Sequence, residues 1–267
     1  NMFKVALYLL IAVILAIFLL PFVYTISPYQ LDPTKILQAP SFEHLFGTDR
    51  LGRDMFARVL NGGQTSLIIG FLAASISSIV GLFIGINAGY FKGNIDKTIT
   101  IMIDLFLTFP TFFLLLALVS YIQASALILI IVISITSWMG MARMIRSESF
   151  AIGNKPFIKI LKVANVSTFK IIFKYFAPLL APIFLISFTF GVGGSILAES
   201  GLSFLGLGVN PPSMSWGSLL SDGKAVIDIA WWVSFFPGLM IFLITFCLIQ
   251  ISDYLQGLAN KKEIIQN

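Results

Sequence analysis

The chain has 267 residues, of which 58% are hydrophobic and only 11% are charged; its mean hydropathy is +0.96 and its formal net charge +5. Soluble domains carry about 25% charged residues, so this composition excludes a soluble globular protein and indicates a polytopic membrane protein. In a membrane protein, a modest positive charge is better interpreted through the distribution of Lys and Arg among the loops than as a sign of nucleic-acid binding. The single cysteine, Cys247, excludes an intrachain disulfide and a Cys-x-x-Cys metal site. We expect no metal site, no cofactor and no nucleic-acid partner.

Six apolar stretches are each long enough to form a helix across the hydrocarbon core of a bilayer, which takes about 20 residues. The first stretch is too long for the apolar part of a signal peptide, and no small-residue cleavage site follows it, so we interpret it as a membrane-spanning helix. Very few residues separate the third stretch from the fourth, which predicts a tight hairpin. The predicted spans are residues 5–26, 67–89, 101–121, 124–142, 177–198 and 231–251.

Three long loops separate these spans, at residues 27–66, 143–176 and 199–230. With a cytoplasmic N-terminus, twelve of the 17 Lys and Arg residues fall in inner segments and five in outer ones. Cytoplasmic loops are the basic ones, so we expect both termini and loop 143–176 in the cytoplasm, and the protein in the cytoplasmic membrane. We divide the chain into residues 1–66, with the first helix and an outer loop, and a membrane core at residues 67–267.

Small residues are frequent in the spans at 67–89 and 177–198. Two interpretations stay open for them. They allow helices to approach one another closely, or they give a translocation path a smooth polar lining.

The loop at 143–176 is basic and amphipathic, unlike the apolar spans that flank it. It carries seven Lys and Arg residues against one acid, Glu148. Gly153 and Asn154 predict the end of the helix that leaves the fourth span, and Pro156 suits the first position of the next helix. Apolar residues then follow at the spacing of one helix face, namely Phe157, Ile160, Leu161 and Ala164.

A second short amphipathic helix is predicted after Asn165, which interrupts the first. Ser167 can cap this second helix, and apolar residues recur at helical spacing from Phe169 to Phe176. Pro178 is expected to open the return into the membrane.

Two roles stay open for this pair of helices. They lie on anionic membrane lipid with their lysines at the headgroups, or the first inserts its apolar face into a groove of a soluble partner. A buried Phe or Ile contributes about 1.5–3 kcal/mol, whereas an exposed ion pair contributes about 0–1 kcal/mol. We therefore expect apolar side chains, rather than Lys159 and Lys162, to anchor a partner.

Four motifs along the chain form one pattern: FGTDRLGRD at 46–54, AGYFKGNID at 88–96, ESGLSFLGLG at 199–208 and PPSMSWG at 211–217. Together they resemble the permease subunit of ATP-binding-cassette (ABC) importers of the dipeptide, oligopeptide and nickel group. The resemblance covers nearly the whole chain.

This resemblance implies an all-α polytopic membrane protein with six transmembrane helices and the permease architecture of a type I ABC importer. It also implies three kinds of partner: a second, homologous permease, two cytoplasmic ABC ATPases that dock on the loop, and an extracytoplasmic solute-binding protein. ATP hydrolysis would belong to the ATPases, so the chain itself would have no catalytic residue. The resemblance leaves the choice between peptides and nickel or metal chelates open.

The resemblance assigns residues to two sites. The contact that couples the ATPases to the membrane would lie at 157–164 and just beyond, on Phe157, Ile160, Leu161, Lys162, Ala164, Asn165 and Phe169. The external loop and gate would include Asp49, Arg53, Asp54, Glu199, Ser203 and Phe204. The loop departs from the family at 160–162, where relatives usually have Ala-Ala-Arg, and at Asn165, where they have Gly. Asn tolerates the left-handed backbone that Gly supplies, so we expect the turn to survive.

The outer loops carry three further expectations. Asp49, Arg53 and Asp54 form local ion pairs and caps, or else contact the binding protein directly. We expect His44 to be a solvated loop histidine, with a ligand role in nickel handling as the alternative. Glu199 begins a short element separate from the fifth span and lies at the mouth of the pathway, because the glycines of 199–208 disfavour helix.

Rival functions fit the sequence less well. A nucleotide enzyme needs a P-loop, which the chain lacks. An intramembrane serine hydrolase would use Ser203, but the only histidine lies in a distant loop. A stand-alone secondary transporter needs ionisable residues inside the membrane, and only Asp104 and Glu199 come near, at span ends.

Overall fold

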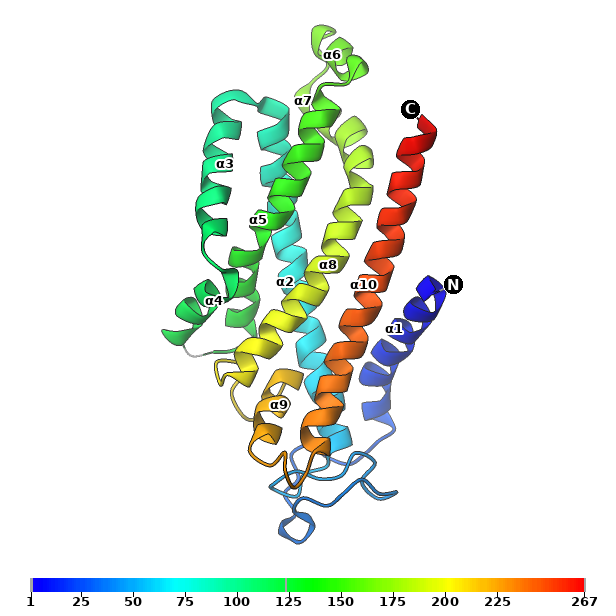
Figure 1. The fold of residues 1–267 in the computed structure, drawn as a ribbon, viewed down its shortest axis with the longest axis vertical. Coiled ribbons are helices and arrows are strands. Elements are labelled where there is room, and N and C mark those ends of the chain that lie inside the picture. Colours follow the sequence, from blue (N-terminus) through cyan, green and yellow to red (C-terminus); the bar gives the residue numbers. More distant parts are fainter. Residues whose placement is uncertain (1, 123, 267) are drawn as a thin grey trace.

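The computed structural model describes residues 2–122 and 124–266, with side chains up to residue 259. In this part of the chain the regular structure is helical, and the one isolated β-bridge joins Thr48 to Asp54. The long helices run side by side, with α6 at one end and α9 at the other (Figure 1). The helices are α1 Met2–Leu19, α2 Met55–Phe91, α3 Gly93–Thr108, α4 Thr111–Ser120, α5 Ala126–Gly153, α6 Pro156–Val163, α7 Thr168–Ile171, α8 Ala177–Phe204, α9 Trp216–Lys224 and α10 Trp232–Gln266, with 3-10 turns at Leu20–Phe22 and Pro33–Lys35 and a π-helical turn at Ile172–Phe176.

Five of the described helices are long and apolar enough to cross a membrane, and a bent pair, α3 and α4, makes six if it is one span. The span predicted at 101–121 corresponds to this bent pair, in which α3 and α4 meet at 79°. Phe109 adopts an extended conformation between them. Pro110 has no N–H to continue the hydrogen bonding of α3, so the helix ends there.

Helix α8 continues through the segment that was expected to separate from it. It runs from Ala177 to Phe204, so the expectation that Glu199 begins a separate element is wrong. Tertiary contact outweighs the low helix propensity of glycine here: a Cβ at Gly201 would lie 3.2 Å from the ring of Phe112. The helix ends at Phe204, and Gly206 follows it with a φ of +82°, which glycine adopts readily.

Glycines bring α2 and α5 into close contact, which confirms the packing interpretation for this part of the second span. A Cβ on Gly89 would lie 2.5 Å from the Cβ of Ser149, and one on Gly81 would lie 2.7 Å from that of Met141. The two backbones approach closely because these positions have no side chain.

The second loop helix is not a separate element. Residues Thr168–Phe204 form one continuous helix of 37 residues, with the π-helical turn inside it. Pro178 lies two residues after the π-helical turn, inside this continuous helix, and does not begin a new one. The first loop helix, α6, is separate and begins at Pro156 as predicted.

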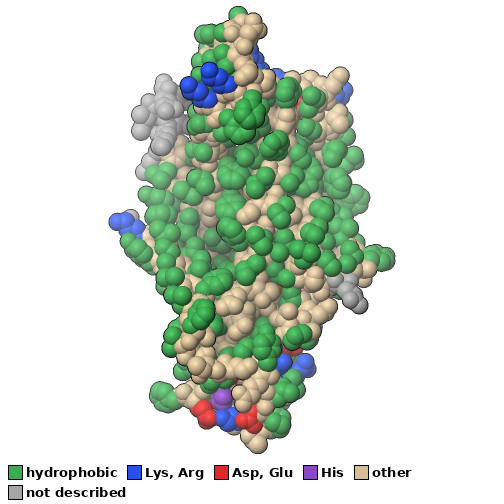
Figure 2. Space-filling model, turned by 180° about the vertical axis from the view of Figure 1, so that it is seen from behind, with side chains coloured by type: hydrophobic (Ala, Val, Ile, Leu, Met, Phe, Trp, Pro, Cys, Tyr) green, Lys and Arg blue, Asp and Glu red, His purple; other side chains and the backbone are tan. Residues whose placement is uncertain are grey.

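The surface agrees with a membrane protein. Hydrophobic side chains cover the middle of the body, and charged side chains gather towards its two ends (Figure 2). The acidic side chains and the histidine visible in this view lie at the α9 end, and basic side chains lie beside α6.

Candidate functional sites at the two ends of the bundle

At the α9 end, Asp54 organises the start of α2. Its carboxylate accepts a 2.8 Å hydrogen bond from the backbone N–H of Ala57, which is the N-cap interaction. The other oxygen accepts from the Tyr24 hydroxyl at 3.0 Å and lies 2.8 Å from Nδ1 of His44. Burial, followed by the charge of Asp54, raises the pKa of Tyr24 above its ordinary value.

His44 is buried, with only 6% of its surface exposed. The expectation of a solvated loop histidine is therefore wrong. Its ring lies between the Asp54 carboxylate and the Lys35 ammonium, whose Nζ is 3.3 Å from Nε2. These contacts fix the loop against the start of α2, and a single histidine in a loop gives no sequence signal for them.

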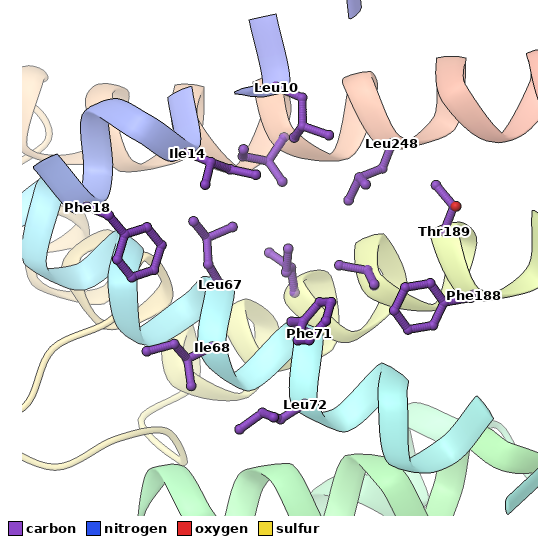
Figure 3. A pocket seen from close by; sticks show the side chains of 13 residues that line it. Leu10, Ile14, Phe18, Leu67, Ile68, Phe71, Leu72, Phe188, Thr189 and Leu248 are labelled. Atoms are coloured by element: carbon purple, nitrogen blue, oxygen red, sulfur yellow. The ribbon is translucent and has the colours of Figure 1, made fainter. Parts of the chain in front are cut away.

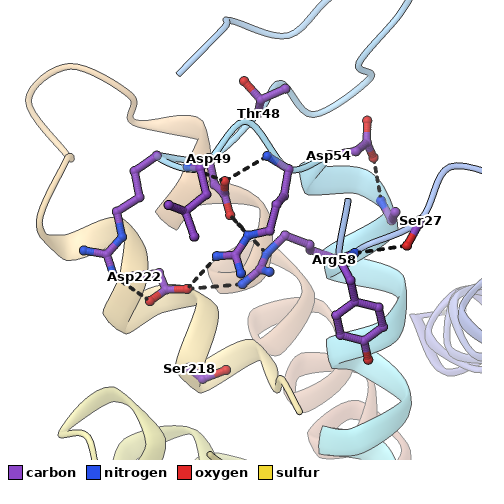
Figure 4. Close-up of polar contacts among 12 residues, drawn as sticks. Ser27, Thr48, Asp49, Asp54, Arg58, Ser218 and Asp222 are labelled. Atoms are coloured by element: carbon purple, nitrogen blue, oxygen red, sulfur yellow. Dashed lines mark hydrogen bonds and ion pairs between the residues drawn. The ribbon is translucent and has the colours of Figure 1, made fainter. Parts of the chain in front are cut away.

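Asp49 closes the turn before α2 and begins a network of charges (Figure 4). Its carboxylate accepts from the backbone N–H of Leu51 and of Arg53, and from Nε of Arg53 at 2.7 Å. Arg58, which is 4% exposed, lies 3.4 Å away. The local ion pair and cap predicted for Asp49, Arg53 and Asp54 are confirmed.

Asp222 on α9 extends this network across the chain, and sequence reasoning missed it. Its carboxylate lies 3.2 Å from Arg58, 3.5 Å from Arg50 and 3.8 Å from Arg53. Three arginines against two local aspartates, of which Asp54 caps α2, could have indicated a further acid. The network ties the loop before α2 to α9.

Glu199 lies inside the protein rather than at an open mouth. It is 0% exposed and accepts hydrogen bonds from Ser66 at 3.0 Å and Ser203 at 2.6 Å. Ser203 also accepts from Ser215, which caps α9, at 3.2 Å. The backbone N–H of Trp216 donates to Ser66. Glu199 and Ser203 thus join α8 to α2 and α9, whereas Phe204 is 37% exposed under the ammonium of Lys224.

At the opposite end, α6 presents apolar side chains to the outside. Phe157 is 40% exposed, Ile160 67% and Val163 84%. On the following segment, Phe169 is 72% exposed. Such a group of exposed apolar side chains beside lysines is typical of an interaction surface.

The inner face of α6 differs from the predicted one. Ile158 is fully buried, and Leu161 packs half-buried against the same apolar cluster as Ile171 and Phe176. Ala164 lies one residue beyond the helix. Of the predicted apolar face, Phe157 and Ile160 therefore point outward, whereas Leu161 packs against the protein's own loop.

Polar contacts fix the base of this loop to the turn after α2. Arg146 holds Asp96 through two hydrogen bonds, one of 2.8 Å, and Lys92 donates to the side chain of Asn154 at 2.6 Å. The ammonium of Lys162 lies 4.0 Å from the centre of the Tyr90 ring. Lys162 is therefore more than a free surface charge.

Asn165 ends α6 in the left-handed conformation, with a φ of +54°. The expectation that Asn takes the place of Gly in this turn is confirmed. Ser167 occupies the N-cap position of α7, but its side chain makes no capping hydrogen bond. The predicted cap is thus correct in position and wrong in its interaction.

Comparisons with known proteins agree with this geometry. The family described as "Binding-protein-dependent transport system inner membrane component" matches residues 81–262. The chain belongs to this family. Its membership makes the chain the inner-membrane permease subunit of an ABC importer and not an enzyme.

Relatives match over most of the chain. The chain is 33% identical to the oligopeptide transport system permease protein OppC of Haemophilus influenzae, over 97% of this chain and 84% of that one. It is 36% identical to the dipeptide transport system permease protein DppC of Alkalihalophilus pseudofirmus, over 94% and 82%.

A solved structure of the MetNI methionine ABC transporter in an inward-facing conformation has the same fold. It superposes with a TM-score of 0.60 at 15% identity, covering 75% of this chain and 97% of that one. The expected all-α permease architecture is confirmed.

Proposed function

We propose that this chain forms half of the translocation pathway of a peptide importer, and that α6 couples it to cytoplasmic ATPases. Relatives named for oligopeptide and dipeptide transport support peptides as the substrate. Nickel is the alternative substrate, and among the described residues no group of three His, Cys, Asp or Glu side chains could hold a metal ion. A second permease would supply the other half of the pathway.

The exposed apolar side chains of α6 are the observation that carries the coupling role. Ile160 and Val163 point away from their own subunit, at the end where basic residues gather. Lysines beside exposed apolar side chains also suit a lipid surface, which is the competing interpretation. Both interpretations put the α6 end in the cytoplasm. The excess of Lys and Arg in the inner segments supports the same side for the two termini.

At the α9 end, the network of Asp49, Arg58 and Asp222 would hold the surface that receives the solute-binding protein. Its ion pairs hold the loop before α2 and helix α9 together in one outer surface. Glu199 and Ser203, which lie on α8, would link this outer surface to the coupling loop through the length of that helix.

Ile160→Asp is the sharpest test of coupling, because Ile160 is 67% exposed and its replacement leaves the subunit interior intact. Leu161→Asp would disturb the loop's own packing, since Leu161 is half-buried. We expect Ile160→Asp to insert normally but to lose its ATPases and peptide uptake, because a charge would enter an apolar groove. Lys159→Ala on the same helix is the control. An Ile160→Asp complex that retains its ATPases and transports at the wild-type rate would favour the lipid interpretation.

A further inference from the structure

A mostly apolar cavity of about 490 Å³ with several uncharged polar side chains lies between α2, α5, α8 and α10. Its lining includes Ser78, Ser137, Ser187 and Gln256, together with the thioethers of Met141 and Met144. No residue of its lining carries a charge. The cavity therefore combines hydrogen-bonding groups with apolar surface.

Ser78 gives the cavity an unused hydrogen-bonding group. Its residue surface is 2% exposed, yet it lines the cavity, and within the described residues its hydroxyl has no protein partner. The neighbouring Ser77 instead donates to the carbonyl of Ala74 at 3.1 Å. Ser187 points to the Met144 sulfur at 3.4 Å, which is a weak acceptor. Because Ser78 borders the cavity, its hydroxyl can donate to or accept from a molecule that enters this space.

An apolar groove on the opposite side of α8 provides a comparison. This groove of about 430 Å³ between α1, α2, α8 and α10 is lined by apolar side chains such as Phe18, Leu67 and Phe71 (Figure 3). Thr189 is its one hydroxyl, and it donates to the carbonyl of Leu185 in its own helix at 2.8 Å. Ser187 and Thr189, two residues apart on α8, thus line two different spaces, and the one beside Ser187 has more polar side chains.

We propose that the cavity beside Ser78 is a solute subsite of the pathway, which binds uncharged hydrogen-bonding groups such as the backbone amides of a peptide. Hydroxyls and an amide can both donate to and accept from a peptide bond, and the thioethers of Met141 and Met144 adapt to varied side chains. Without a fixed charge, the subsite does not select on the charge of the solute. The inference rests on the proposed function and names the chemistry of its pathway.

Thiol labelling tests the water access and the neutrality of the cavity. The assembled complex, with Cys247→Ser and Ser137→Cys, is placed in lipid nanodiscs and treated with a cationic and an anionic methanethiosulfonate reagent of similar size. We expect both reagents to label Ser137→Cys at comparable rates and to leave the matched Thr189→Cys unlabelled. An unlabelled Ser137→Cys, or a preference above about tenfold for one charge, would overturn the subsite.

Removal of the hydroxyl tests its role in binding. We expect Ser78→Ala to lower peptide uptake by about two- to tenfold, the effect of one lost hydrogen bond. Thr189→Val, which removes a hydroxyl already bonded within its helix, should transport at the wild-type rate. Equal uptake in Ser78→Ala and the wild type would contradict the assignment.

The two proposals fail in different ways. If the wild-type complex imports peptide but Ser137→Cys stays unlabelled, the subsite is wrong and the proposed function stands. If both reagents label the cavity but the complex imports no peptide, the proposed function is wrong, and so is the assignment of a peptide as the ligand of the subsite.

Discussion

The hydroxyl of Ser203 donates a 2.6 Å hydrogen bond to the carboxyl group of Glu199, one turn earlier on α8. The second oxygen of that carboxyl group accepts from Ser66 on α2, and Ser66 in turn accepts from the first residue of α9. A single buried side chain therefore holds three helices together at one end of the bundle.

Replacement of Glu199 should weaken this junction. We expect Glu199→Ala to destabilise the complex by about 1–3 kcal/mol for each hydroxyl left unpaired, whereas Glu199→Gln keeps an acceptor and loses less. The measurement is the thermal unfolding of the purified complex, together with its peptide uptake. A Glu199→Ala complex that melts at the wild-type temperature would show that the carboxyl group does not hold the junction.

Alkaline pH should loosen the α9 end through Tyr24. Its pKa is raised in the folded state above the ordinary value of 10.0, by burial and then by the charge of Asp54. The neutral phenol therefore contributes stability that is fully present below pH 10 and is lost as the pH rises further, since the unfolded state ionises first. We expect Tyr24→Phe to lose less stability above about pH 10 than the wild type.

The exposed Tyr29 of the same loop provides the control, since it is 51% exposed. Tyr29→Phe should follow the wild-type profile of stability against pH. If Tyr24→Phe follows it as well, the contact with Asp54 has no role in alkaline stability.

The turn at Asn165 should tolerate glycine and reject a branched side chain. Its φ of +54° costs a β-branched residue about 1–2 kcal/mol, and it costs glycine nothing. We expect Asn165→Gly to retain ATPase binding, and Asn165→Val to bind more weakly because α6 would be misplaced. Co-purification of the ATPases with each variant measures this. Strong binding by Asn165→Val would show that the turn does not set the position of α6.

Close contact between α2 and α5 predicts a sharp difference between two glycines. Gly89→Ala would place its Cβ 2.5 Å from that of Ser149, whereas a Cβ at Gly194 meets nothing within 4 Å. We expect Gly89→Ala to cost about 1–3 kcal/mol by overpacking, and Gly194→Ala to be neutral. The fraction of each variant that is monodisperse after extraction, and its melting temperature, report the difference.

Much of the fold could be predicted from the sequence because local signals and tertiary packing agree. Gly153 ends α5, Pro156 begins α6 and Asp54 caps α2, each as local chemistry dictates. The apolar length of the spans reflects the thickness of the bilayer, which does not depend on the partners of each helix.

Other features depend on contacts that sequence spacing does not reveal. An apolar run with Pro110 inside it can continue or bend, and here it bends by 79°. Gly201 stays helical because Phe112 packs against it, and His44 is buried because Asp54 and Lys35 meet its ring. Asp222 joins its arginines only after α9 folds back onto the outer loop.

The helix from Thr168 to Phe204 is continuous, with the π-helical turn and Pro182 inside it. Its 37 residues span about 55 Å at 1.5 Å per residue. A tilt of about 10° about one end would displace the other by roughly 10 Å, from the same geometry. The helix begins just beyond α6 and ends one turn after Glu199, so under the proposed coupling a rotation imposed at the α6 end would also move the α9 end.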